Sequence, residues 1–269
     1  MDNIVEISKL NFKYGENIIF DDFNLNIKKG SFTSIIGSNG SGKSTLMKII
    51  VGLLKCDGQI VVDGITISET TYKDVRAKIG MVFENPDNQF VAETVMDEIA
   101  FSLENMNFDK NEIRENIKEI AQLLNIEDIM EKEPHSLSGG QKQLIALASA
   151  LAIKPKLLVL DEALEMLDEA ERQKMLHILS ELNKTKGLTI INITHNSEEL
   201  LYGTDIVIIN KGQIIENGPT LEVLRKEKSF KNNGLELPFI VDLSYKLKYY
   251  GLVEDIVIDM DELVDIIWK

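Results

Sequence analysis

The chain has 269 residues, of which 44% are hydrophobic, and a formal net charge of −15. A chain of this length can bury a sizeable core, as one large domain or as a domain with a small appendage. The acidic balance disfavours nucleic acid or an anionic lipid surface as a partner, because both reward patches of Lys and Arg. Cys56 is the single cysteine, which leaves no intrachain disulfide and agrees with a reducing compartment.

The N-terminus and the hydropathy pattern bear on contact with membranes. The opening MDNIVEISKL has an acid at position 2 and lacks an unbroken apolar region, so we expect no signal peptide. No window approaches the about 20 apolar residues that a membrane-spanning helix needs. Any membrane contact is therefore expected to go through a partner.

The first half of the chain predicts strands followed by helices. The runs IVEISKLNFKY and IIFDDFNLNI alternate apolar and polar residues, which predicts antiparallel strands with one solvated face. SFTSIIGSNGSGKSTLMKIIVGLL predicts a short buried strand, a Gly/Ser turn and a helix from Thr45 to Leu54, and the strand-like runs GQIVVDGITI and KIGMVFE follow. NEIRENIKEIAQLL then spaces its apolar residues by three and four, as a helix does.

The second half alternates helices with strands. HSLSGGQKQLIALASALAIKPKLLVLDEA predicts a turn, a helix and a strand, and GLTIINITHN with DIVIINKGQIIENG supplies three more strands. This alternation predicts an α/β fold with a largely parallel sheet. Residues 95–137 show no strand pattern and are interpreted as a helical insertion. After the linker NNGLELP, two short helical patterns run to Trp268.

Residues 37–45, GSNGSGKST, fit the phosphate-binding pattern G-x-x-x-x-G-K-[ST] between a predicted strand and a predicted helix. Glycines let the backbone fold tightly, so that N–H groups face phosphate oxygens, and the helix N-terminus adds a positive dipole end. We expect Lys43 to reach the β- and γ-phosphates, Ser44 to bind Mg²⁺ and Thr45 to lie near the α-phosphate. The alternative is a glycine turn without a ligand. The loop consists of Gly37, Ser38, Asn39, Gly40, Ser41, Gly42, Lys43, Ser44 and Thr45.

The sequence KLLVLDEA places Asp161 and Glu162 directly after an apolar strand. Ligands of open α/β sheets bind at the carboxyl ends of the strands. We expect Asp161 to hold Mg²⁺ through water and Glu162 to polarise the water that attacks the γ-phosphate, because phosphoryl transfer depends on positioning and charge neutralisation. Taken alone, such an acid pair would more often be a solvated strand end.

The motif LSGGQ, residues 137–141, opens a predicted helix. With the phosphate-binding loop, the acid pair and the histidine in INITHN, it resembles the set found in ATP-binding-cassette (ABC) ATPases. The resemblance implies that Ser138, Gly139, Gly140 and Gln141 contact ATP held by an opposite subunit, in a head-to-tail dimer. Serine, glycines and a helix N-terminus make a reasonable anion site. A helix-capping role for Ser138 is expected as well.

The same resemblance assigns further residues. It implies that His195 is a switch histidine that contacts the γ-phosphate and the attacking water, and that Tyr14 in FKYG stacks on adenine. Catalysis would then involve Glu162, His195 and Lys43. Without the resemblance His195 would be a polar residue at a core edge and Tyr14 a strand aromatic. His135 and His177 have no such support and are expected to be surface or boundary residues.

The stretch GMVFENPDNQFVAETVMDEIAFSLEN is similar to the ATPase subunits of energy-coupling-factor (ECF) importers, of the A1 or CbiO type. LDEALEMLDE and the C-terminal stretch support the likeness. The fold it implies is a P-loop ABC-ATPase domain in residues 1–219, with a mixed, mainly parallel sheet core, an antiparallel β subdomain and the helical insertion. Residues 220–269 would form a small C-terminal helical appendage and a candidate dimer contact.

The ECF resemblance also implies cofactors and partners. They are ATP and Mg²⁺, a second cassette subunit in a homodimer or heterodimer, a transmembrane coupling protein of the EcfT type and a small substrate-binding membrane protein of the EcfS type. The chain would then act at the cytoplasmic face of the cell membrane as a peripheral subunit. The transported molecule would be a vitamin or a transition-metal ion, which the sequence does not identify.

The sequence departs from the family pattern at three places. Glu84 stands where a glutamine that senses the γ-phosphate is usual, and is a candidate Mg²⁺ ligand, whereas Gln89 is a second, recurring glutamine of the group and a candidate nucleotide contact. Leu164 and Glu165 replace a Thr-Ser pair in a loop that meets the opposite subunit. Leu144 replaces an arginine after LSGGQ.

Three functional hypotheses follow from these observations. The first is an ATP-hydrolysing importer subunit. The second is a nucleotide-sensing regulatory cassette with slow turnover in a heterodimer, motivated by the extra acids. The third is a cassette in DNA repair or translation, which the acidic charge balance argues against.

Overall fold

The structure is a computed structural model, which describes residues 2–86 and 89–268. Its core is a six-stranded sheet with the order β10-β9-β3-β8-β7-β6, in which only the pair of β9 and β10 is antiparallel. The strands are β3 (Phe32–Ile36), β6 (Ile79–Val82), β7 (Leu157–Asp161), β8 (Thr189–Ile193), β9 (Asp205–Asn210) and β10 (Gln213–Pro219). The predicted α/β fold with a largely parallel sheet is confirmed.

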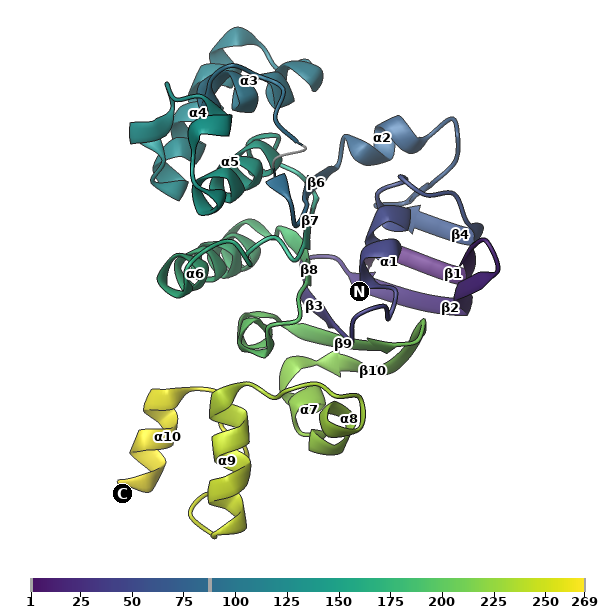
Figure 1. The fold of residues 1–269 in the computed structure, drawn as a ribbon, viewed down its shortest axis with the longest axis vertical. Helices are drawn as coiled ribbons and strands as arrows, with labels where there is room; N and C mark the ends of the chain where they lie inside the picture. Colours follow the sequence, from purple (N-terminus) through teal and green to yellow (C-terminus); the bar gives the residue numbers. More distant parts are fainter. Residues whose placement is uncertain (1, 87–88, 269) are drawn as a thin grey trace.

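A second, antiparallel sheet has the order β2-β1-β4-β5. It lies with helix α1 on one side of the core sheet, while α5 and α6 lie on the other side (Figure 1). The strands are β1 (Asn3–Tyr14), β2 (Asn17–Lys28), β4 (Asp57–Val62) and β5 (Ile65–Thr66), and the helices are α1 (Lys43–Ile50), α5 (Gly139–Ala152) and α6 (Glu169–Lys186). The short helix α2 (Tyr72–Arg76) follows this sheet.

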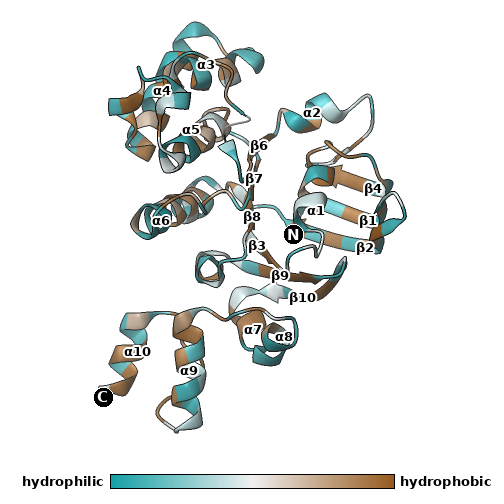
Figure 2. Cartoon of the chain, in the orientation of Figure 1, coloured by the Kyte–Doolittle hydropathy of each residue, from teal (hydrophilic) through white to brown (hydrophobic). Residues whose placement is uncertain are grey.

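Both faces of the core sheet are covered, which explains the unbroken apolar runs of its strands. In β7, Leu158 and Leu160 pack toward α5 and α6, whereas Leu157 and Val159 pack toward α1 and the antiparallel sheet. All five residues of this strand are buried. Figure 2 shows the hydrophobic colour along the core strands and mixed colours on the covering helices.

The expected helical insertion is present, and none of its described residues is in a strand. Helix α3 (Val95–Asn105) begins with Thr94, which accepts a hydrogen bond from the Asp97 N–H. Helix α4 (Lys110–Leu124) begins with a reciprocal capping box between Asp109 and Glu112. These two helices pack against α5, the helix that opens with LSGGQ.

Residues after Pro219 share a hydrophobic core with the sheet. Ile206 and Ile208 of β9 pack with Phe230, Val241 and Leu263. Two short helices that the sequence analysis did not predict precede the two that it did. They are, in chain order, α7 (Thr220–Leu224), α8 (Glu227–Asn232), α9 (Phe239–Tyr249) and α10 (Met260–Ile267). Among the described residues no helix is both long enough and apolar enough to cross a membrane.

Candidate nucleotide-binding site

The phosphate-binding loop joins the buried strand β3 to helix α1. A Cβ atom on Gly37 would lie 2.0 Å from the carbonyl oxygen of Ile209, so only glycine fits between the loop and β9. The turn between β9 and β10 also holds the loop, because the N–H of Gly212 donates to the Ser41 carbonyl at 3.1 Å. The sequence prediction of strand, loop and helix is confirmed here.

Lys43 is the first residue of α1, and its side chain turns back over the loop. The Nζ atom donates to the carbonyls of Gly37 and Ser38 at 2.7 and 3.3 Å. Burial lowers the pKa of Lys43, while the nearby acids Glu162 and Asp161 oppose that shift. The ammonium group is thus held over the loop as a desolvated cation, which favours interaction with phosphate oxygens.

The pair of Ser44 and Asp161 joins the start of α1 to the end of β7. The Ser44 hydroxyl donates to Asp161 Oδ1 at 3.1 Å, and Asp161 is buried. Burial raises the pKa of Asp161, the Ser44 hydrogen bond lowers it, and the charges of Glu162 and Glu84 raise it further. A hydroxyl and a carboxylate are hard oxygen ligands of the kind that Mg²⁺ prefers.

The fit to a nucleotide can be tested on the loop itself. The Ser41 hydroxyl is buried and has no hydrogen-bond partner among the described residues. A buried polar atom without a partner is costly in a folded protein and calls for an explanation. Together with the Lys43 cation and the Ser44–Asp161 oxygen pair, it fits a loop that completes its hydrogen bonds with phosphate and Mg²⁺.

Glu162 and His195 meet at the same edge of the sheet. The Glu162 backbone has a left-handed conformation with φ 51°, and its N–H donates to the Ile193 carbonyl at 2.9 Å, which ties it to the end of β8. His195, just beyond β8, places Nδ1 3.5 Å from Glu162 Oε2. The sequence analysis expected both side chains at the γ-phosphate, and the structure brings them together.

Glu165 is a site residue to which sequence reasoning gave no role within its own chain. It was assigned to a loop that meets an opposite subunit, which stays a prediction, and its Oε1 lies 2.6 Å from His195 Nδ1. Burial, followed by a hydrogen bond shared with Glu162, raises the pKa of Glu165. Its departure from the family serine was the available signal, although the sequence alone did not show which way the side chain points.

The LSGGQ segment forms the start of α5, away from α1 (Figure 1). The Ser138 hydroxyl accepts from the Gln141 N–H at 3.3 Å, and the Gln141 side-chain oxygen accepts from the Ser138 N–H at 3.2 Å. The expected capping role of Ser138 is therefore confirmed. Ser138 and Gly139 are exposed, so their polar groups face outward from this chain.

The structure places the remaining predicted site residues on three other segments. Tyr14 is exposed at the end of β1 and packs edge-on against Phe12. Glu84 is exposed beyond β6, within electrostatic range of Asp161. Gln89 is half-buried and lines a cavity between β6, α3 and α5. Asp87 and Asn88, part of the NPDNQF stretch, lie outside the described residues.

The other two histidines lie at aromatic contacts elsewhere. His135 is exposed and lies edge-on to Phe90, with 6.3 Å between ring centroids. His177, on α6, makes a similar contact with Tyr202 at 5.1 Å. The site described above therefore draws on His195 alone.

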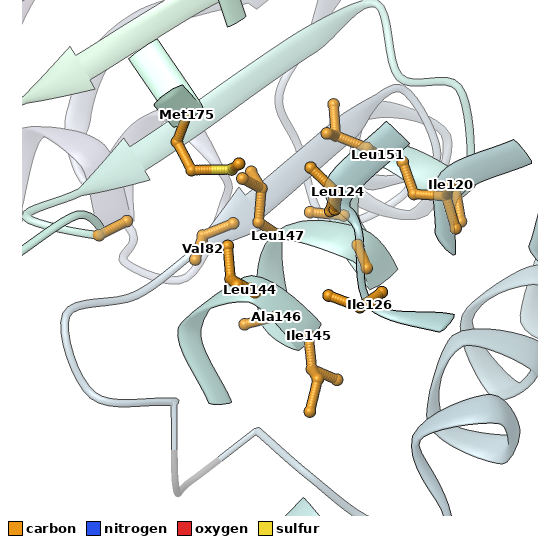
Figure 3. Close-up of a cluster of buried hydrophobic side chains, with 14 of the residues drawn as sticks. Val82, Ile120, Leu124, Ile126, Leu144, Ile145, Ala146, Leu147, Leu151 and Met175 are labelled. Carbon is orange, nitrogen blue, oxygen red and sulfur yellow. The ribbon is translucent and has the colours of Figure 1, made fainter. Parts of the chain in front are cut away.

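A hydrogen bond joins helix α5 to the segment that carries Glu84. The side chain of Gln143 donates from Nε2 to the Phe83 carbonyl at 3.0 Å. Leu144, which replaces the arginine expected there, is buried in the core beside Val82 and Leu147 (Figure 3). Leucine at this position therefore contributes to the apolar packing of α5.

Comparisons with known proteins agree with this geometry. The family described as ABC transporter matches residues 20–165. The energy-coupling factor transporter ATP-binding protein EcfA of Pediococcus pentosaceus is 41% identical over 97% of this chain and 95% of its own length. EcfA1 of Leuconostoc mesenteroides is 44% identical over 90% of each chain.

Solved structures show the same fold. The structure of cbiO1 from Clostridium perfringens, described as part of the ABC transporter complex cbiONQ, has a TM-score of 0.77 and 34% identity, covering 90% of this chain and 99% of that one. A dimeric post-hydrolysis state of the cassette MJ0796 with ADP and Pi has a TM-score of 0.73 and 29% identity over 80% and 98%. This chain therefore belongs to the ABC transporter ATPase family, within the group of energy-coupling factor transporter ATP-binding proteins.

Proposed function

We propose that this chain is the ATP-hydrolysing energy-coupling subunit of an ECF-type importer for a vitamin or a transition-metal ion. The observation that carries the proposal is the convergence of Lys43, Asp161, Glu162 and His195 beside one phosphate-binding loop. The full-length likeness to EcfA and EcfA1 proteins supports the transport system. The subunit would lie at the cytoplasmic face of the cell membrane, attached through its partner proteins.

The residues divide the reaction between them. The loop N–H groups and Lys43 bind and orient the phosphates of ATP, with Thr45 near the α-phosphate and Tyr14 beside the adenine. Ser44 and Asp161 would hold Mg²⁺, which neutralises phosphate charge when bound. Glu162 accepts a proton from the attacking water, and His195 orients that water against the γ-phosphate.

A second cassette subunit completes the site. Ser138 and Gly139 of the LSGGQ segment are exposed at the start of α5, away from α1 of their own chain, where they would contact ATP bound by a partner. A helix N-terminus with two glycines leaves backbone N–H groups available for an anion. The dimeric state described for the MJ0796 cassette is in keeping with this arrangement. The helices after Pro219 are candidates for a further dimer contact.

The coupling to a transmembrane protein is proposed to occur at the Gln89 cavity. This cavity has a volume of about 270 Å³ and is lined by β6, α3 and α5. The Gln89 side-chain oxygen and the Ser149 hydroxyl are buried there without a hydrogen-bond partner among the described residues. A polar side chain from a short helix of the coupling protein would enter this cavity and satisfy these groups, and Gln143 would transmit its position to the segment of Glu84.

The experiment that tests the proposal combines Glu162→Gln with reconstitution. The chain is purified with its second cassette and membrane partners, placed in liposomes, and assayed for ATPase activity and for uptake of a panel of vitamins and divalent transition-metal ions. We expect the variant to lose nearly all ATPase activity and uptake. Glu181→Gln, an exposed acid on α6, is the matched control. Recovery of the chain only as a free monomer without membrane partners would refute the transport role.

A second candidate function is a nucleotide-sensing cassette with slow turnover, whose partner supplies the active site. The additional acids Glu84 and Glu165 favour it, because both raise the negative charge where ATP must bind. The Glu162→Gln variant separates the two functions. Unchanged ATPase activity of the assembled complex would favour the sensor, and near-complete loss favours the enzyme.

A further inference from the structure

Glu165 and His195 form the closest contact between ionisable side chains in the described part of the candidate site. The distance from Glu165 Oε1 to His195 Nδ1 is 2.6 Å, compared with 3.5 Å from Glu162 Oε2 to the same nitrogen. The His195 side chain is 54% exposed and that of Glu165 is 35% exposed. A pair this open to water adds little to stability, so its significance is geometric.

The backbone on both sides of Glu165 is fixed. Leu164 and Leu167 are buried to 2 and 3% exposure. The guanidinium of Arg172 donates to the carbonyls of these two leucines, each at 3.2 Å. The backbone of the loop that carries Glu165 is therefore held on both sides of this residue.

The backbone of His195 is fixed as well. The N–H of Thr194 donates to the Ile35 carbonyl at 3.2 Å, and the Thr194 hydroxyl accepts from the Asn196 N–H at 3.0 Å. The imidazole ring, in contrast, is more than half exposed and can rotate about its side-chain bonds. Without a partner, either ring nitrogen could face the nucleotide.

We propose that Glu165 is a positioning residue whose carboxylate accepts a hydrogen bond from Nδ1–H of His195 and so presents Nε2 to the γ-phosphate and the attacking water. A carboxylate that binds one nitrogen of a histidine sets both the tautomer and the orientation of the ring. Glu165 performs this task within the same chain, before any dimer forms. The inference rests on the proposed role of His195 in ATP hydrolysis.

The direct test is the tautomer of His195, observed by NMR after labelling histidine with ¹⁵N. The chain has three histidines, so His135 and His177 serve as internal references. The spectra are recorded without nucleotide, at a pH of about 8.5, above the ordinary titration range of imidazole. We expect the proton of His195 to lie on Nδ1 in the unmodified chain and to move to Nε2 in Glu165→Ala.

Equal nitrogen shifts of His195 in the unmodified chain and in Glu165→Ala would overturn the proposal. So would a proton on Nε2 in the unmodified chain. Changes that also affect His135 and His177 would indicate a general disturbance of the fold and would count against a specific pairing. The measurement needs neither turnover nor membrane partners, so its failure is distinct from a failure of the proposed transport function.

Kinetics of the assembled complex provide the second test. We expect Glu165→Ala to lower kcat by about tenfold, the low end of the loss when a group that orients a histidine is removed, and to leave KM for ATP within about twofold. Glu165→Gln retains an oxygen that can accept from Nδ1, so its kcat should fall between those of Glu165→Ala and the unmodified chain. Glu181→Ala, exposed on α6, is the control. An unchanged kcat in Glu165→Ala, or a loss confined to KM, would contradict the proposal.

Discussion

Glu98 offers a prediction about how the segment after Gln89 is anchored. Its side chain is 5% exposed, and its Oε2 atom accepts from the N–H groups of Val91 and Ala92 at 2.8 and 2.9 Å. A single buried carboxylate oxygen thus ties the end of this segment to α3. We predict that Glu98→Ala destabilises the fold and loosens residues 90–92, and that Glu98→Gln does so to a smaller extent.

The magnitude follows from the two hydrogen bonds. A buried donor that loses its partner costs about 1–3 kcal/mol. The cavity beside Glu98 can admit water, so the lower end applies and Glu98→Ala should cost about 2 kcal/mol for two donors. Both donors share one oxygen, which an amide can replace. Glu98→Gln therefore loses only the charge assistance, about 1 kcal/mol.

Thermal unfolding measures the global effect, and hydrogen exchange measures the local one. For a chain of this size we expect the midpoint to fall by about 4–8 °C in Glu98→Ala and about 2–4 °C in Glu98→Gln. The amides of Val91 and Ala92 should exchange faster. Glu104→Ala, exposed on the same helix, should change neither. An unaltered midpoint in Glu98→Ala, or equal effects of the two variants, would refute the hydrogen-bond account.

Two further predictions concern electrostatics. Glu84→Gln should raise the Mg²⁺ concentration needed for half-maximal ATPase activity, because it removes a negative charge that acts on Asp161 and attracts the cation; a titration that matches the unmodified chain would mean that Glu84 faces away from bound Mg²⁺. Hydrogen bonds from Lys78 and Lys29 lower the pKa of Asp63, so its contribution to stability is present above the ordinary aspartate value of about 3.9 and disappears as the pH falls toward the lowered one. The difference in unfolding midpoint between the unmodified chain and Asp63→Asn should thus stay constant from about pH 7 to 5 and narrow below about 4; a constant difference down to pH 3 would contradict this.

The sequence predicts best where a local pattern carries the structure. Gly37 and Lys43 lie within a few residues of each other, and local chemistry sets their positions. The structure places Gly37 against β9 and folds Lys43 back over the loop. The run before Asp161 is apolar at every position because both faces of β7 are covered, so the strand and its terminal acids were also predictable. The helical insertion was predicted from the spacing of its apolar residues.

Prediction fails where a contact depends on the path of the chain. Glu165 and His195 are distant in sequence, and their contact depends on a turn held by Arg172 and on the end of β8. No periodicity encodes such a turn. The short helices α7 and α8 were missed for a different reason: they have five and six residues, too few for a helical pattern to show, and are stabilised by packing of residues such as Phe230 in the shared core.

Two departures from the family pattern, Glu84 and Glu165, act on one site rather than on separate loops. Burial is the main cause that raises the pKa of both Asp161 and Glu165, and the negative charge of Glu84 raises both further. The three acids therefore lie close enough to repel one another. ATP would add further negative charge, which Lys43, Lys48 and Mg²⁺ would offset. Because Glu165 lies against His195, its carboxylate has a hydrogen-bonding partner before nucleotide binds. Removing the Glu165 carboxylate therefore has two opposing effects. It relieves the repulsion of ATP, which would lower KM, and it releases the His195 ring, which would lower kcat. Measuring the two constants separately shows which effect governs turnover.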